Sequence, residues 1–410
     1  MPEIKPFRAY TYGATHQKSI KALVCPPYDV ISPDQRETLM NRNPLNFVRV
    51  ELPTGDPSTR YTAARALWDR WTDQGVLKRE ANAAFYVYEA RFRSPLDGRP
   101  LRRRGFFAAL KAVPWGQGVY PHEKTLPTHK ADRLQLFKAL WAQTSPIQLL
   151  ARDGDGRIDR LIAAHQKGAP WIQFTDEARV AHRFWKWSAD AQAEEMARLF
   201  QDTPCAIADG HHRYETSLAY GRWAKRKWGA ASPASAYVMA YFSSSGDAGL
   251  EVLPTHRAVS WEKRQFVKLA GWGRLKPVTG LRDLKALMDG KKGPGLREVG
   301  VYREGKYFIY QFTKTPPELL KRPHAQLPVA CLHAGPLKGL GKEDFFFTRT
   351  PEEAVEEAGK HNGWAFLLAP NTVNEVLDVS TAGLVMPPKS TYFYPKIPSG
   401  ILSHSLHGAF

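Results

Sequence analysis

The stretch Asp209-Gly-His-His-Arg213 combines side chains that suit the binding of an anion. Its two histidines and its arginine offer donors that match phosphate oxygens, and arginine does so in a planar, two-pronged way. Gly210 has no Cβ, so the backbone can approach a ligand closely at this point. A phosphate or nucleotide site is one interpretation. The alternative is that Asp209 caps a helix, Arg213 pairs with an acid, and the histidines are ordinary turn residues.

The flanking residues predict a strand that turns into a helix at this motif. Small and apolar residues precede Asp209, and the apolar spacing from 217 to about 228 is typical of a helix. A turn of this kind directs free backbone N–H groups and the positive end of the helix dipole to one point. The same dipole disfavours imidazolium, so either His211 or His212 is a candidate for proton transfer or metal binding.

Further polar stretches lie in predicted loops beside apolar strands, and prolines or glycines punctuate them. Binding groups concentrate in loops that a rigid scaffold holds. These stretches are 26–30, 122–125 with 130–133, 254–257 and 389–396.

Individual side chains in these loops have candidate roles. His122 and Glu123 are predicted catalytic residues, one of them as a general base. Lys130 and Arg133 are three residues apart at a helix start, so they could clamp a phosphate or form a solvated face. The full set of predicted phosphate or nucleotide contacts is Asp209, Gly210, Arg213, Lys130, Arg133, His256, Arg257, Lys389, Ser390 and Lys396.

A magnesium ion held mainly by substrate phosphates needs only one or two carboxylates. The candidates are Asp29, Glu123 and Asp209. No spacing among the histidines and acids matches a cage such as HExxH, so the sequence gives little support to a transition-metal site.

The overall charge favours an anionic partner. The chain has 410 residues and a net charge of 58 − 40 = +18. The charge is spread in short clusters such as Arg102-Arg-Arg104, for which a solvated basic surface is the simpler explanation. Three isolated cysteines argue against a disulfide framework and a thiolate zinc site. Without a leader or a long apolar run, we expect a cytoplasmic chain with no membrane partner.

Alternating strand and helix patterns predict a mixed α/β fold with antiparallel hairpins. The clearest hairpins join 84–89 to 104–111 and span 299–310, and 237–242 predicts a buried strand. The stretch 261–290 is mostly helical in pattern. No boundary is sharp: the chain is predicted to be one unit, 1–410, with tentative parts at 1–115, 116–290 and 291–410.

Several stretches together resemble the bacterial and archaeal family known as domain of unknown function 1015: 26–31, 122–125 with 130–134, 145–147, 209–216, 253–257 and 386–396. Six motifs occur in order over essentially the whole chain. The turn at 209–213 also resembles the phosphate-binding motif of the ParB/sulfiredoxin-like superfamily, which includes free serine kinases and implies a core of that type around the turn. Sulfiredoxins carry a reactive cysteine inside the equivalent turn, whereas Cys205 lies outside it, which argues against sulfinic-acid repair.

The resemblance and the motifs together favour a small-molecule phosphotransferase or phosphatase that acts on serine or phosphoserine. ATP, ADP or pyrophosphate is the candidate donor and magnesium the candidate cofactor. One alternative is a nucleotide-dependent nucleic-acid-binding protein of ParB type, although neither a helix-turn-helix pattern nor a long basic stripe is present. Another is a metal-dependent hydrolase. The phosphoryl-transfer hypothesis assumes that loops 122–133 and 389–396 fold over the turn after residue 208.

Overall fold

The computed structural model describes residues 2–123, 127–229, 232–289 and 297–410, with the side chains of 127–130 and 289 excepted. The chain divides into two compact units. Unit 1 comprises Met1–Tyr120, Thr125–Leu250 and Pro395–Phe410, and unit 2 comprises Pro121–Lys124 and Glu251–Tyr394. Each unit therefore draws on more than one of the three consecutive parts predicted from the sequence.

Unit 1 is built on a nine-stranded mixed sheet with the strand order β6-β11-β8-β12-β5-β4-β10-β9, and β1 also pairs with β5. The β11–β6 and β12–β8 pairs are parallel and the others antiparallel. In sheet order the strands are β6 (Val119–Tyr120), β11 (Cys205–Asp209), β8 (Ile147–Ala151), β12 (Tyr237–Ser244), β5 (Pro100–Lys111), β4 (Ala84–Arg93), β10 (Ala181–Ser188), β9 (Ile172–Thr175) and β1 (Ile4–Lys5). The predicted hairpin of 84–89 with 104–111 is confirmed as β4 and β5.

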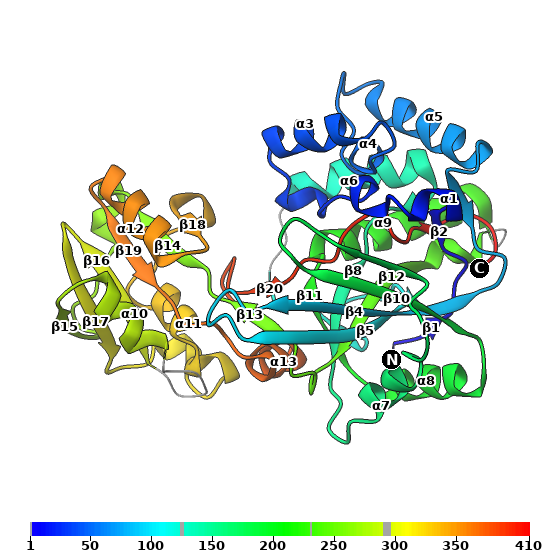
Figure 1. The fold of residues 1–410 in the computed structure, drawn as a ribbon. Helices are drawn as coiled ribbons and strands as arrows, with labels where there is room; N and C mark the ends of the chain where they lie inside the picture. The colour runs from blue at the N-terminus through cyan, green and yellow to red at the C-terminus, as the bar shows by residue number, and fades with distance from the viewer. Residues whose placement is uncertain (1, 124–126, 230–231, 290–296) are drawn as a thin grey trace. The chain divides into compact units, whose positions relative to one another are not determined.

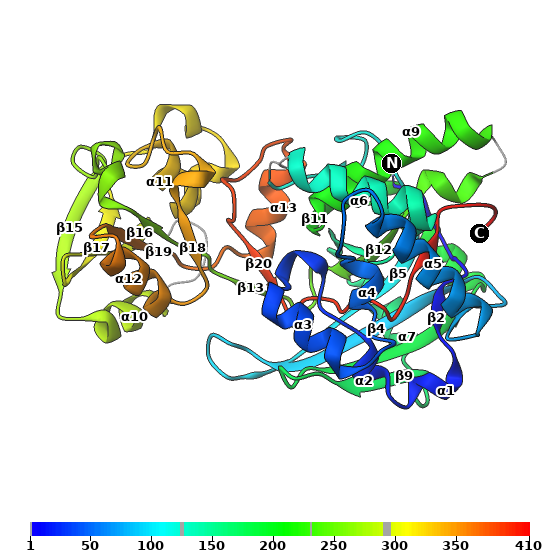
Figure 2. The same ribbon diagram turned by 90° about the horizontal axis from the view of Figure 1, so that it is seen from above.

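Helices cover both faces of this sheet (Figure 1). On one face lie α7 (Arg157–Ala164) and α8 (Ala191–Asp202), and on the other α3 (Pro33–Arg42), α4 (Val48–Glu51), α5 (Arg60–Asp73) and α6 (Pro127–Leu140). Figure 2 looks onto α3, α4 and α5. The remaining elements of unit 1 are α1 (Ala14–Gln17), α2 (Ile20–Leu23), the 3-10 turns Tyr28–Val30 and Pro233–Ala236, α9 (His211–Trp228), and the small pairs β2 (Tyr10–Tyr12) with β3 (Leu77–Arg79) and β7 (Ala142–Gln143) with β21 (His404–Ser405).

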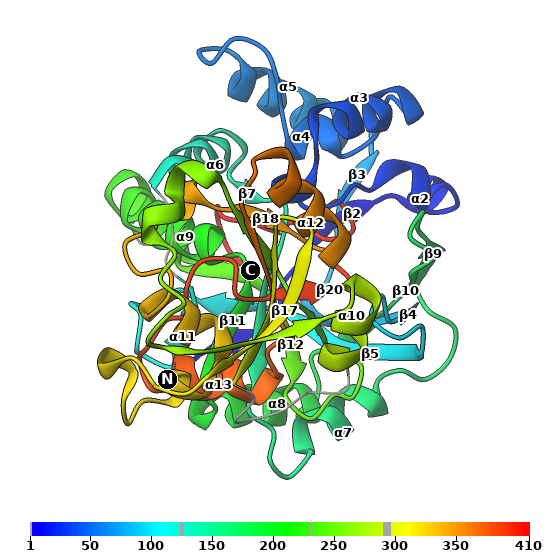
Figure 3. The same ribbon diagram turned by 90° about the vertical axis from the view of Figure 1, so that its left-hand side faces the viewer.

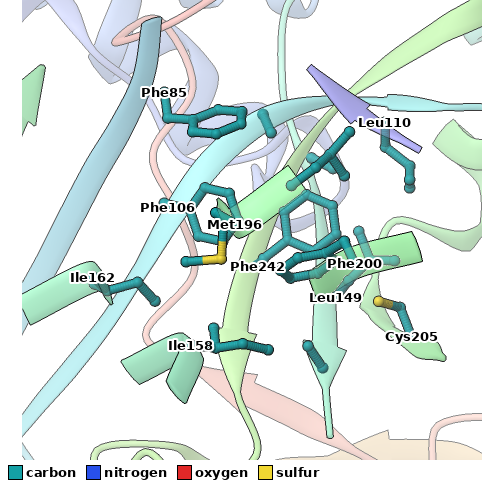
Figure 4. Close-up of a cluster of buried hydrophobic side chains, with 14 of the residues drawn as sticks. Phe85, Phe106, Leu110, Leu149, Ile158, Ile162, Met196, Phe200, Cys205 and Phe242 are labelled. Carbon is teal, nitrogen blue, oxygen red and sulfur yellow. The ribbon is translucent and has the colours of Figure 1, made fainter. Parts of the chain in front are cut away.

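The main core of unit 1 fills the space between the sheet and α7 and α8 (Figure 4). Alternate residues of each strand point into it, as the period of two along a strand requires. Phe106 of β5 packs at its centre, with ring centroids 5.3 Å from Phe85 and 5.6 Å from Phe200. Full burial of one such side chain stabilises the fold by about 1.5–3 kcal/mol. The residues between them on each strand point to the opposite face of the sheet.

Unit 2 contains a six-stranded antiparallel sheet with the order β15-β17-β16-β19-β14-β18. Helices α10 (Leu281–Asp289) and α12 (Pro351–Lys360) pack on it through Leu284, Ala354 and Ala358 (Figure 3). The strands are β15 (Gly273–Val278), β17 (Lys306–Phe312), β16 (Glu298–Arg303), β19 (Trp364–Leu367), β14 (His256–Val259) and β18 (Phe346–Thr348). The other elements are β13 (Glu251–Leu253) with β20 (Tyr392–Tyr394), α11 (Pro328–Ala334), α13 (Val373–Thr381) and the 3-10 turns Trp261–Phe266, Pro317–Leu319, Pro323–Gln326 and Lys342–Asp344.

The fold is mixed α/β, as predicted, and the 299–310 hairpin is confirmed as β16 and β17. The helical pattern expected across 261–290 is wrong in its middle, where 273–278 forms β15. This strand lies at the edge of the sheet and is largely exposed, so Pro277 is tolerated there and little apolar alternation marks it. Within the part of the chain that the structure describes, no helix is long and apolar enough to span a bilayer.

Candidate functional site

The predicted strand, turn and helix around Asp209 are present. β11 ends at Asp209, Gly210 takes the left-handed conformation (φ 89°, ψ 28°), and α9 begins at His211 without a side-chain cap. A Cβ on Gly210 would lie 2.9 Å from Ile147 Cγ2 and 3.1 Å from Arg213 Nε, so both space and dihedral angle require glycine. The positive end of an 18-residue helix therefore begins directly behind a tightly packed turn.

Asp209 is the centre of an ion cluster. Its Oδ2 lies 3.2 Å from Lys396 Nζ and 3.4 Å from Arg213 Nη2, while the Gly210 N–H donates to its Oδ1 at 2.9 Å. Burial opposes ionisation of this carboxyl, but Lys396 and Arg213 outweigh burial and hold its pKa well below the usual range. Asp209 is therefore an anion at neutral pH. Its bond to the adjacent N–H differs from a helix cap, which binds the N–H two or three residues on.

Arg213 orders the turn. Its side chain is buried, and its guanidinium donates to the Pro146 carbonyl at the start of β8 as well as to Asp209. Burial alone would lower its pKa, yet Asp209 and then Asp29 raise it, so the charge is retained. This geometry agrees with the interpretation in which Arg213 pairs with an acid. Arg213 would therefore attract an incoming anion through its charge at long range and not through a direct hydrogen bond.

Arg133 also comes to this region, from α6. It is 2% exposed, so the solvated-face interpretation is wrong for it. Its Nη1 donates to the Glu51 carbonyl at 2.6 Å, its Nε to Asp132 at 2.8 Å, and its guanidinium lies 4.2 Å from the centroid of the Tyr28 ring. Lys130, its predicted partner, lies outside the described side chains.

The motif that contains Tyr28 and Asp29 is thereby brought near the turn. Burial raises the pKa of Tyr28 to about 12, against the opposing charge of Arg213. Asp29 is exposed in the 3-10 turn that follows Pro27, and its charge acts on Arg213. Segments around residues 29, 133, 209–213 and 396 thus converge within unit 1.

Glu51, at the end of α4, is a member of this cluster that the sequence analysis missed. Its side chain is fully buried. Burial raises its pKa, while Arg133, the hydroxyls of Thr144 and Ser145, and Arg213 act in the opposite direction. The available signal was an acid directly after Phe47, Val48 and Val50, whose apolar side chains predict burial, where a charged residue needs a partner.

The two histidines lie half-buried in the first turn of α9. His211 is close enough to Asp209 for its charge to lower the pKa of that carboxyl. Cys205 opens β11 and is fully buried, and burial raises the pKa of its thiol. A buried, protonated thiol is a poor nucleophile, which agrees with the expectation drawn from its position outside the turn.

The second set of predicted residues lies in unit 2. His122 is buried, and its Nε2 lies 2.7 Å from Thr391 Oγ1 and 3.7 Å from Glu123 Oε1. The Ser390 N–H donates to Glu123 Oε1 at 3.1 Å. Lys389, next to it, is exposed and has a positive φ of 55°. The loops 122–123 and 389–391 are therefore joined within this unit.

Arg257 and His256 are internal. Arg257 donates to His333 Nε2 and to the carbonyls of Thr255, Pro388 and Lys389 at 2.7–3.1 Å. Burial lowers the Arg257 pKa to about 9 despite the opposing charge of Glu123. Burial also lowers the pKa of His256 to about 4, and its Nδ1 accepts the Leu368 N–H. A direct phosphate contact by either residue would require these arrangements to open.

The candidate magnesium ligands separate by unit, with Asp29 and Asp209 in unit 1 and Glu123 in unit 2. Among the residues whose side chains the structure describes, no three His, Cys, Asp or Glu residues gather as a metal site. Asp209 is already matched by two cations, whereas the exposed carboxylate of Asp29 fits the single protein ligand that magnesium needs beside a phosphate. That both sets of residues act in one centre stays a prediction.

Comparison with known proteins gives a family for this chain. A family model described as "Protein of unknown function (DUF1015)" matches residues 4–330. No curated protein has a significantly similar sequence.

Similar solved structures include a conserved hypothetical protein from Pyrococcus furiosus (15% identity, 74% of this chain and 95% of that chain, TM-score 0.37). Others are a free serine kinase in complex with AMP (14%, 70% and 86%, 0.35) and a C-terminally truncated SbnI from Staphylococcus aureus (12%, 74% and 86%, 0.38). Likeness this distant assigns no activity.

Proposed function

The chain belongs to the DUF1015 family of proteins of unknown function, and we propose that its unit 1 binds a phosphate group at the turn after β11 and transfers a phosphoryl group to or from the hydroxyl of a small metabolite. Serine and phosphoserine are the preferred pair, and a nucleotide or pyrophosphate is the partner substrate. The supporting observation is that α9 begins directly behind the left-handed Gly210, with Lys396 directed from the C-terminal segment at Asp209, which immediately precedes this glycine.

Charge balance explains why a divalent cation belongs to this proposal. The cations of the cluster are matched in number by its carboxyl groups, so it is close to neutral: Lys396, Arg60, Arg133 and Arg213 against Asp29, Glu51, Asp132 and Asp209. A neutral site attracts a polyphosphate weakly, and phosphoryl transfer depends mainly on positioning and charge neutralisation. Magnesium held by Asp29 would supply the missing positive charge beside the phosphates.

The chain's own groups then have distinct roles. Backbone N–H groups at the start of α9 bind phosphate oxygens, and Lys396 donates to the group in transfer. His211 or His212 takes the proton from the acceptor hydroxyl as its oxygen forms the new bond to phosphorus. The bond from phosphorus to the donor's bridging oxygen breaks, and its electron pair leaves with that oxygen.

The test uses the full-length chain with serine and, in turn, ATP, ADP and pyrophosphate, in magnesium or in chelator. Phosphoserine is followed by phosphorus NMR, and the reverse direction starts from phosphoserine. We expect magnesium-dependent transfer in one direction. Removal of one charge-assisted contact in Lys396→Ala should lower the rate by about tenfold to hundredfold.

Two controls sharpen this assay. Lys186→Ala removes another lysine of unit 1 that pairs with an acid, Glu80, at 2.6 Å, and it should leave the rate unchanged. His122→Ala and Glu123→Gln test whether the residues of unit 2 take part. Equal rates of transfer in the wild type, Lys396→Ala and His212→Ala would show that the turn takes no part in the reaction.

A further inference from the structure

A row of polar side chains runs across the sheet of unit 1 on the face opposite its apolar core. Asp209 of β11 pairs in register with Gln148 of β8, and Gln148 pairs with Tyr241 of β12. The intervening residues Ile147, Leu149 and Phe242 belong to the core on the other face, where Figure 4 shows Leu149 and Phe242. The row therefore starts at the proposed phosphate turn and continues along the tyrosine-bearing face.

Arg103 extends this row onto β5. It pairs with Ala90 of β4 and points away from the core residues Phe106 and Ala108, which lie three and five positions on. Its side chain is 0% exposed, and its guanidinium carbon lies 5.6 Å from the centroid of the Tyr241 ring. Among the described residues no acceptor is in hydrogen-bonding geometry with any of its three nitrogens.

Such a group is unusual, because an unpaired buried charge costs several kcal/mol, and buried polar groups in native proteins nearly always have a partner. The neighbouring donors share the condition. Tyr241 Oη, Ser243 Oγ and Gln148 Nε2 are buried and make no hydrogen bond of good geometry within the described chain, although Arg103 and Ser243 lie close enough to act on the Tyr241 hydroxyl. A buried guanidinium whose near neighbours offer only neutral hydroxyl oxygens points to an absent anion.

The acids near Arg103 are occupied elsewhere. Asp247 accepts the N–H groups of Arg104 and Gly249 at 2.6 and 2.8 Å. Asp176 accepts from His182 Nε2 at 3.2 Å, if that nitrogen carries the proton. The other ring nitrogen of His182 then accepts from the Tyr88 hydroxyl at 2.9 Å, so the Tyr88 oxygen near Arg103 is a neutral acceptor that cannot balance the charge of the guanidinium.

We propose that Arg103, with the hydroxyls of Tyr241 and Ser243, binds a carboxylate group of a small molecule. One fixed positive charge and neutral donors match a monoanion better than a phosphate dianion, and the planar fork of arginine fits a carboxylate with two parallel bonds. The further step, that this molecule is the phosphoryl acceptor or its phosphorylated product, rests on the proposed function. The carboxylate site itself does not.

The experiment compares ligands that differ only in this group. Wild-type chain is titrated calorimetrically with phosphoserine and phosphoethanolamine, with serine and serinamide, and with inorganic phosphate. We expect the carboxylate member of each pair to bind about tenfold or more tightly, because a charge-assisted bidentate contact contributes about 1.5–3 kcal/mol. Equal binding within both pairs, or binding of neither member, overturns the proposal.

Variants locate the effect. Arg103→Met should abolish the preference for the carboxylate, Tyr241→Phe should reduce it while keeping the ring under the guanidinium, and Arg103→Lys should restore part of it. Arg102→Met is the matched control, because Arg102 is the next residue on β5 and half exposed, and it should behave as wild type. A preference that persists in Arg103→Met, or that Arg102→Met also removes, contradicts the assignment.

Stability separates a binding role from a structural one. If Arg103 awaits a ligand, Arg103→Met removes an uncompensated buried charge, and the melting temperature of the ligand-free chain should stay level or rise. If Arg103 instead balances Asp247, the melting temperature should fall, and the proposal is wrong. If the wild-type chain prefers carboxylate ligands but does not bind nucleotides, the proposed function alone is refuted. If it binds nucleotides but shows no preference for carboxylate ligands, the carboxylate site alone is refuted.

Discussion

Two buried arginines, one in each unit, have opposite surroundings. No carboxylate of the described residues pairs with Arg257 in unit 2, yet three carbonyl oxygens and a histidine nitrogen accept from its guanidinium. Arg103 in unit 1 is equally buried and has no acceptor among the described residues. The first satisfies its hydrogen bonds inside the protein and acts as structure. The second leaves them open, which is the condition of a group that binds something else.

The largest expected effect tests the structural side of this comparison. Arg257→Met would leave the carbonyls of Thr255, Pro388 and Lys389 without their donor, and a buried carbonyl left unsatisfied costs about 1–3 kcal/mol. We expect a loss of about 3–5 kcal/mol of stability, read from the urea midpoint of unit 2. Arg103→Met, measured in the same way, should lose none. Equal losses would erase the distinction.

Gly210→Ala tests the packing of the turn. Its Cβ would press on Ile147 at 2.9 Å at a φ that costs a residue with a side chain about 1–3 kcal/mol. Urea unfolding should show this loss, together with weaker phosphate binding. Gly98→Ala is a useful control, because Gly98 also has a positive φ but a Cβ there would meet nothing within 4 Å. A Gly210→Ala chain as stable as Gly98→Ala would contradict the close packing.

The ion cluster gives a pH dependence. Because the pKa of Asp209 is lower in the folded than in the unfolded chain, its ionised form stabilises the fold above the unfolded pKa of about 3.9. That contribution is lost as pH falls through the lower folded value. The stability difference between wild type and Asp209→Asn should thus be constant above about pH 5 and shrink below about pH 4. A difference that is independent of pH in urea titrations would mean that Asp209 is not paired as described.

The smallest effect is expected at the surface. Lys186→Ala breaks an ion pair that is more than a third exposed on the lysine side, so it should cost less than about 1 kcal/mol. Comparing the stability lost in Lys186→Ala with that lost in Lys396→Ala separates the effect of breaking a surface ion pair from the effect of removing a cation of the cluster. A larger loss in Lys186→Ala would show that ion pairing in general, and not the cluster, governs these variants.

Some of the site could be predicted because the chemistry is local. The turn at Asp209 has a strand, a glycine and a helix in a continuous run, and each follows from neighbouring residues. Other parts depend on tertiary packing that one sequence does not contain. The burial of Glu51 against Arg133 is set by where α4 meets α6, and the edge position of β15 is set by its single partner strand.

Arg103 shows this limit most clearly. In the run Arg102-Arg-Arg104 the three residues are chemically identical, and the sequence favours a solvated basic surface. In the structure, alternation along β5 divides them: Arg102 is half exposed, Arg104 pairs with Asp159 at 2.7 Å, and Arg103 alone points to the tyrosine face. The strand prediction for 104–111 did not reach far enough to reveal that alternation.

The most direct test of the account is calorimetric titration of the full chain with ADP and with pyrophosphate in magnesium. We expect binding by the wild type and by Lys186→Ala, and binding weakened by about tenfold or more in Lys396→Ala and Gly210→Ala. Binding of equal strength in all four proteins, or no binding by the wild type, would contradict a phosphate site at the turn after β11.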